Sequence, residues 1–162
     1  MAKNYHGVQI NPSPTIVEKA GAVIADCRNR IMKYDENGDV VLATAGTDIP
    51  VGIALIEAGI NDISGKESGS VAKGDAVDIL IKDMGVVLAG ATIKKGQEVA
   101  AGANGLAAAA ASGNYVLGIA LENAAANEYL TIQLAKYQKA GATGSDEQSP
   151  DEQSPEEEGT QE

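Results

Sequence analysis

The chain has 162 residues, a net charge of −11 and an apolar set that contains neither Phe nor Trp. This length corresponds to one domain, whose core must be built from Ala, Val, Ile and Leu. The composition lacks the basic stripe with interleaved aromatic residues that nucleic-acid binding needs, the single cysteine excludes an intrachain disulfide framework, and no run of 18 apolar residues indicates a membrane span.

The negative charge is concentrated at the C-terminal end of the sequence. Residues 146–162 hold eight acidic residues and no basic one, which leaves residues 1–145 with a net charge of −3. The body is therefore close to neutral. Its small aliphatic side chains each bury little area, so the hydrophobic stabilisation of a monomer is modest. We therefore expect contacts between copies of the chain to add stability.

Residues 1–19 are predicted to form an extended N-terminal arm. The segment Asn11-Pro12-Ser13-Pro14 excludes a helix and a central strand, because proline fixes φ and lacks an amide donor. Terminal segments are loose unless something holds them. Two interpretations remain open, in which the arm lies along its own domain or docks on a partner.

Residues 20–82 are predicted to form a first β unit. Within it, Asp35–Gly38 carries a strong hairpin signal. The stretch Val51–Leu55 is apolar on both faces, as expected of a strand buried on both sides, and Gly52 indicates a bend or a close approach of another backbone. Residues 56–73 are rich in turn formers and are predicted to be a surface loop.

Residues 89–135 repeat the order of the first unit. Leu117–Leu121 copies Val51–Leu55, and an Asn-Gly pair lies in the middle of both units. The alanine-rich run at residues 106–112 favours a helix by propensity, but the glycines that bound it and its alignment with the first unit favour a strand.

These matches predict a degenerate duplication of a β-rich unit, for which chance similarity among Ala/Gly/Val-rich strands is the alternative. The predicted fold is all-β, a small β-barrel or β-sandwich with its body at residues 20–137. Residues 138–162 are predicted to be a disordered acidic tail, because a polar, Pro-broken repeat cannot bury enough apolar area to order itself.

The residues that could carry chemistry do not combine into a catalytic or metal-binding set. His6 is the only histidine and lies in the arm. Cys27 has two arginines nearby that could lower its pKa, but it lacks a companion histidine. The pattern Asp35-x-Asn37-x-Asp39 imitates the start of a calcium loop, yet the sixth and twelfth positions are Val40 and Gly46 instead of Gly and Glu. We therefore predict no enzyme activity, no cofactor and no metal.

A carrier domain is one alternative function. Lys73-Gly74-Asp75 and Lys94-Lys95-Gly96 look like the paired turns of lipoyl and biotinyl domains, which are also quasi-symmetric β-sandwiches. Those families present one modifiable lysine at a hairpin tip between the halves, and Lys82 is the nearest candidate. Its neighbours lack the Met-Lys-Met and Asp-Lys-Ala motifs of these carriers. An accessory β-barrel subunit is a second alternative.

The repeated hydrophobic-Gly-Ile-Ala-Leu segments, at Val51–Leu55 and Leu117–Leu121 with Gly21 and Gly90 upstream, resemble a family of tailed-bacteriophage capsid cement (decoration) proteins. Members are small β proteins rich in Ala, Gly and Val. The resemblance covers about residues 20–135. The arm, the 56–73 segment and the acidic tail lie outside it.

The resemblance implies a structural protein of the virion that binds the major capsid protein on the outer capsid surface and stabilises contacts between its subunits. It also implies synthesis in the bacterial host cytoplasm and a homotrimer at threefold or quasi-threefold positions. Nucleic acid and membrane are not expected partners. An extended arm can add a strand to a partner or lie along it. The residues expected to bind the capsid are Tyr5, His6, Val8, Ile10, Pro12, Pro14 and Ile16.

Overall fold

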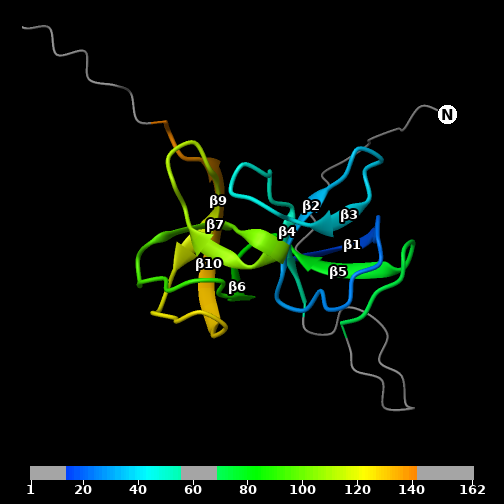
Figure 1. Ribbon diagram of the computed structural model, residues 1–162, viewed down its shortest axis with the longest axis horizontal. Coiled ribbons are helices and arrows are strands. Elements are labelled where there is room, and N and C mark those ends of the chain that lie inside the picture. Colours follow the sequence, from blue (N-terminus) through cyan, green and yellow to red (C-terminus); the bar gives the residue numbers. More distant parts are fainter. Residues whose placement is uncertain (1–13, 56–68, 142–162) are drawn as a thin grey trace, which may run out of the picture.

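The chain folds into two five-stranded antiparallel sheets that lie next to each other along the long axis of the molecule (Figure 1). The computed structural model describes residues 14–55 and 69–141. The first sheet contains β1 (Thr15–Lys19), β2 (Ile31–Tyr34), β3 (Val40–Leu42), β4 (Gly52–Ala54) and β5 (Ala76–Leu80). The second contains β6 (Met84–Leu88), β7 (Glu98–Ala101), β8 (Ala107–Ala109), β9 (Tyr115–Ala120) and β10 (Tyr129–Gln138), with a short 3₁₀ helix, η1 (Ala103–Gly105), before β8.

The two sheets are copies of one topology. Their strand orders are β1-β5-β4-β2-β3 and β6-β10-β9-β7-β8, so each strand of the second sheet is five positions after its counterpart. The registers also match, since Met32 lies opposite Gly52 in the first sheet and Val99 lies opposite Gly118 in the second. Chance similarity would not reproduce register. The predicted all-β fold of two degenerate repeats is therefore confirmed, as a sandwich-like arrangement and not a closed barrel.

The repeated glycine of the two matching strands is explained by a close backbone contact. A Cβ atom on Gly52 would lie 2.1 Å from the carbonyl oxygen of Leu80, and one on Gly118 would lie 2.3 Å from that of Gln133. Leu80 and Gln133 are themselves counterparts, because they pair with Ile53 and Ile119 at matching positions. The close approach predicted at both glycines is confirmed.

The predicted turns and the alanine-rich strand are also present. Asp35 Oδ1 accepts hydrogen bonds from the amides of Asn37 (2.8 Å) and Asp39 (3.0 Å), and Gly38 takes a φ of +83° that glycine adopts without strain. In the alanine-rich run, β8 pairs with β7 and buries Ala107 completely. Pairing and burial thus override the helix propensity of alanine.

The boundaries of three predicted segments differ from the structure. Thr15–Lys19, inside the predicted arm, forms the edge strand β1, which is held by β5 and by a 2.8 Å hydrogen bond from the Ile81 amide to the Pro14 carbonyl. Val71, inside the predicted surface loop, is buried because it exchanges backbone hydrogen bonds with Ile24. At the other end, β10 continues to Gln138. Residues 1–13, 56–68 and 142–162 lie outside the described residues.

The core has one part inside the first unit and one that spans both units. Met32, Val77 and Ile79 belong to the first part. Ile31 and Ile53, on the opposite face of the same sheet, pack with the core of the second unit. The first sheet is therefore covered on both faces, and all three residues of β4 are buried as predicted.

The outward face of the second sheet is different in character. The counterpart of Ile31 is Glu98, and the counterpart of Leu80 is Gln133. Both replacements are polar, and Gln133 is exposed. The duplication has therefore produced two units with unequal roles, in which two apolar positions of the interior sheet are polar in the other sheet.

Candidate interaction surfaces

The structure gives Cys27 the environment of a core residue. Its side chain is completely buried. Burial, together with the Asp26 carboxylate, raises the pKa of the Cys27 thiol to about 11. The charge of Arg28 acts in the opposite direction but is outweighed, and Arg28 forms a two-contact ion pair with Asp26, at 2.8 and 2.9 Å. The thiol is therefore protonated at neutral pH and a poor nucleophile.

The other residues that were considered for metal binding or for a carrier function do not form such sites in the described part of the chain. The Asp35 carboxylate holds the β2–β3 turn, as described above. Within residues 14–55 and 69–141, no three His, Cys, Asp or Glu residues are grouped so that they could hold a metal ion. Lys82 follows β5 and precedes β6, which belong to different sheets, so it does not stand at a hairpin tip as a carrier lysine would. His6 lies outside the described residues.

None of the helices in the described part of the chain is long and apolar enough to cross a membrane.

Exposed apolar side chains gather around two grooves. One groove, of about 630 Å³, lies beside the loop between β3 and β4. We call it the loop groove. Ile49 stands at its rim with 65% of its surface exposed. The residues that line it are Ile16, Lys33, Tyr34, Thr47, Asp48, Ile49, Pro50, Val51, Ile81 and Lys136.

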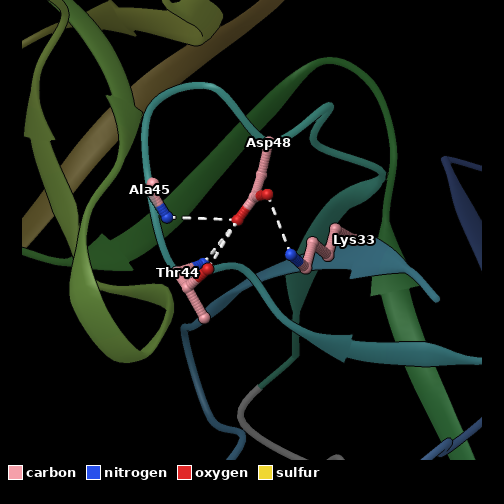
Figure 2. A network of polar contacts seen from close by, with 4 residues as sticks. All are labelled: Lys33, Thr44, Ala45 and Asp48. Atoms are coloured by element: carbon pink, nitrogen blue, oxygen red, sulfur yellow. Dashed lines mark hydrogen bonds and ion pairs between the residues drawn. The ribbon is translucent and has the colours of Figure 1, made fainter.

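A polar network fixes the loop that carries Ile49 (Figure 2). Asp48 Oδ1 accepts a 2.8 Å hydrogen bond from Lys33 Nζ, while Asp48 Oδ2 accepts bonds from the Thr44 amide (2.7 Å), the Thr44 hydroxyl (3.0 Å) and the Ala45 amide (3.1 Å). Burial alone would raise the pKa of Asp48, but these hydrogen bonds outweigh it and lower the pKa to about 2. The ionised carboxylate of Asp48 therefore holds the loop against β2 through its ion pair with Lys33.

Lys136 connects the two units at the same groove. Its Nζ donates a 2.9 Å hydrogen bond to the carbonyl of Val51, and burial lowers the pKa of this lysine. The neighbouring Tyr137 donates its hydroxyl to Glu98 at 2.7 Å, which raises the pKa of the tyrosine. The loop groove is thus bounded by charges that have protein partners.

The second groove lies at the junction of the two units and has a volume of about 550 Å³. We call it the junction groove. Ile53, Leu55 and Leu80 form its wall from the first unit, and Met84, Gly85, Val86 and Tyr129 form its wall from the second; Asn29 completes the lining. None of these residues carries a formal charge. Met84 is 64% exposed and Tyr129 is 60% exposed. Large exposed apolar groups in a concave site indicate an interaction surface.

Only two of the residues expected to bind the capsid fall in the described part of the chain. Ile16 is half-buried against the core of the first unit and lines the loop groove. Pro14 is half-buried where β1 begins. Tyr5, His6, Val8, Ile10 and Pro12 lie outside the described residues, so the structure leaves their role untested.

The two grooves were missed by sequence reasoning. The junction groove joins Leu55, Leu80 and Tyr129, which are far apart in the chain and meet only through the pairing of whole units. One local signal was available. It was the residue type of Asn29, because asparagine adopts a positive φ more readily than most residues, and Asn29 takes a φ of +56° in the structure.

A duplicated β scaffold that presents two apolar grooves has the features of a binding protein. The particular family follows from the sequence. The chain belongs to the XM1 gp53 minor capsid protein family, whose model matches residues 1–134. No curated protein matches the chain.

A solved structure shares the fold. The N base of the head fibre protein gp8.5 of bacteriophage phi29 aligns with a TM-score of 0.54 and 22% sequence identity, over 75% of this chain and 92% of that one. The protein is thus a bacteriophage capsid-associated structural protein, as the resemblance to phage capsid proteins predicted.

Proposed function

We propose that this protein is a capsid decoration protein, which binds the outer surface of a phage head and stabilises contacts between major capsid protein subunits. The observation that carries the proposal is the match of a minor capsid protein family to residues 1–134, a range that includes the N-terminal segment and nearly all of both β units. The two apolar grooves support it, because they give the protein surfaces for a protein partner.

The N-terminal segment is the proposed primary contact with the capsid. It contributes Tyr5, His6, Val8, Ile10, Pro12, Pro14 and Ile16. In an extended chain, residues two positions apart share one face, so Val8 and Ile10 could contact one apolar surface together if this segment binds in an extended form. The fixed point of this segment is Pro14, beyond which β1 belongs to the first sheet.

A homotrimer at threefold or quasi-threefold positions completes the proposal. The supporting observation is the small size of the core side chains, among which there is no Phe and no Trp. Such a core provides a modest hydrophobic contribution to a single copy. Association of copies on the shell buries further apolar area and adds to stability.

The test is co-sedimentation of the purified protein with expanded phage shells stripped of their decoration protein, followed by cryo-electron microscopy. We expect density at threefold-type positions on the outer surface. A variant that lacks residues 2–13 should bind at least tenfold more weakly yet keep the melting temperature of the full chain. The deletion should not extend to residue 18, because it would then remove most of β1 from its sheet. Wild-type protein that fails to bind such shells would refute the proposed function.

A further inference from the structure

The described part of the chain begins at one end of the loop groove. Pro14 is its first residue, and the Pro14 carbonyl accepts a 2.8 Å hydrogen bond from the Ile81 amide. Ile81 and Ile16 both line the groove, and both pack against the core of the first unit. Residues 1–13 therefore join the body at the groove itself.

The face of β1 that lines the groove continues upstream as a sequence pattern. Ile16 lies opposite the core residue Ile79, whereas the next residue, Val17, is exposed. A strict alternation of two kinds of residue is typical of an extended segment with one buried face. Apolar residues and prolines hold the even positions, Val8, Ile10, Pro12 and Pro14, while polar residues and glycine hold the odd positions, Gly7, Gln9, Asn11 and Ser13. The even side of residues 7–13 therefore matches the inward side of β1 and needs an apolar surface.

The loop groove provides such a surface. Ile16, Ile81 and Ile49 are large apolar residues of its lining, and the Asp48 network holds the loop that carries Ile49 in place (Figure 2). A wall that is already fixed loses little conformational freedom when a segment lies against it. The groove is therefore prepared for an apolar occupant.

The charges of the groove and of the segment are also compatible. Lys33 donates to Asp48 at 2.8 Å and Lys136 donates to the Val51 carbonyl at 2.9 Å, so both lysines of the lining have protein partners. Residues 7–13 carry no formal charge. Contact between the two would therefore bury no unpaired charge.

The attachment point favours the chain's own segment over any other occupant. Residues 7–13 span about 23 Å when extended, so they do not need to start far from the groove to cross it. A segment tethered beside its binding site has an effective concentration of about 1 mM. A second copy offers the same residues without this advantage.

We propose that residues 8–13 occupy the loop groove of their own chain in the free protein, with Val8, Ile10 and Pro12 against its apolar wall, and that the capsid displaces them from it. The second part rests on the proposed function, in which the same side chains contact the capsid. Because one side chain cannot contact both surfaces at once, the groove and the capsid compete for this segment. The groove thus covers the apolar side of the segment until the shell is reached.

The first test uses the full-length protein in solution without shells. A photo-activated diazirine analogue of leucine in place of Ile10 has nearly the size of the natural side chain. We expect it to crosslink within its own chain to peptides that carry Ile49 or Ile81, with a yield that does not depend on protein concentration. A crosslink to a second copy, or to a surface outside the loop groove, would overturn the inference.

Two substitutions of the body provide the comparison. Ile49→Lys places a charge at the exposed rim of the groove and should lower the crosslink yield at least fivefold, while the melting temperature stays within about 3 °C of the wild-type value. Val23→Lys is the matched control, since Val23 is 75% exposed and is not among the residues that line the groove. Its yield should stay within twofold of the wild-type value. Equal yields from Ile49→Lys and Val23→Lys would also overturn the inference.

The second test repeats the crosslink with the same chain bound to stripped, expanded shells. Displacement predicts that the product moves from the peptides of the groove to the major capsid protein subunit. A product that remains within the groove on the shells would overturn the displacement. If the groove crosslink forms in solution but the wild-type protein does not sediment with shells, the proposed function fails and the contact in the free protein stands.

Discussion

Replacement of Ile31 by alanine tests whether the two β units form one core. Ile31 belongs to the first sheet, is completely buried and packs with the core of the second unit. The substitution removes three methylene equivalents, which corresponds to about 2.4 kcal/mol of transfer free energy. The cavity adds to this loss, and large-to-small core substitutions of this type cost about 2–5 kcal/mol in total. We expect a loss of about 3 kcal/mol.

The assay is thermal and urea unfolding followed by circular dichroism. A loss of this size lowers the melting temperature by about 10–15 °C in a domain of this length. The two units should still unfold in a single transition. Val17→Ala in edge strand β1 is the control, because Val17 is 62% exposed and its truncation should change the free energy of unfolding by less than about 0.5 kcal/mol. A loss below about 1 kcal/mol for Ile31→Ala would refute a shared core.

Three further predictions concern the loop, the repeated glycines and the tail. The pKa of Asp48 is lowered to about 2, so its stabilising effect is present above the unfolded-state pKa of about 4 and is lost as the pH falls through about 2. Asp48→Asn should cost about 1 kcal/mol at pH 7, after allowance for solvent screening, and only a small fraction of that at pH 2 in urea unfolding. Gly52→Ala and Gly118→Ala should each destabilise the protein by about 1–3 kcal/mol in the same assay, whereas Gly141→Ala, with no atom within 4 Å of its added Cβ, should be neutral. Deletion of residues 142–162 removes eight acidic residues and should leave the melting temperature and shell binding unchanged, while shells that carry this variant should aggregate at lower salt than shells that carry the full chain, because the tail adds repulsion between particles.

The repeat architecture could be predicted because its signals are local. A glycine between apolar residues marks the point where the neighbouring backbone comes within contact distance, and it recurs at Gly52 and Gly118. The Asn-Gly pairs mark turns through the φ values that they require. Each signal needs only its own few residues, and the two copies confirm each other.

The interaction surfaces could not be predicted because their parts meet only in the folded chain. The wall of the junction groove requires β4 and β5 of one unit to lie against β6 and the start of β10 of the other. Val71 shows the same limit at the level of one residue. It follows Gly69 and Ser70 and is followed by Ala72 and Lys73, and only its backbone pairing with Ile24 places it in the core.

The two polar replacements on the outer face of the second sheet have a consequence for the docking of a further unit. In the first unit the equivalent face holds Ile31 and Leu80 and accepts a following unit; in the second it holds Glu98 and Gln133. A third unit, or a second molecule docked head to tail, would have to remove the Glu98 carboxylate from water. Repeated head-to-tail contacts that do not close produce filaments. The replacement of two apolar positions by Glu98 and Gln133 thus disfavours the docking of a further unit over this part of the sheet.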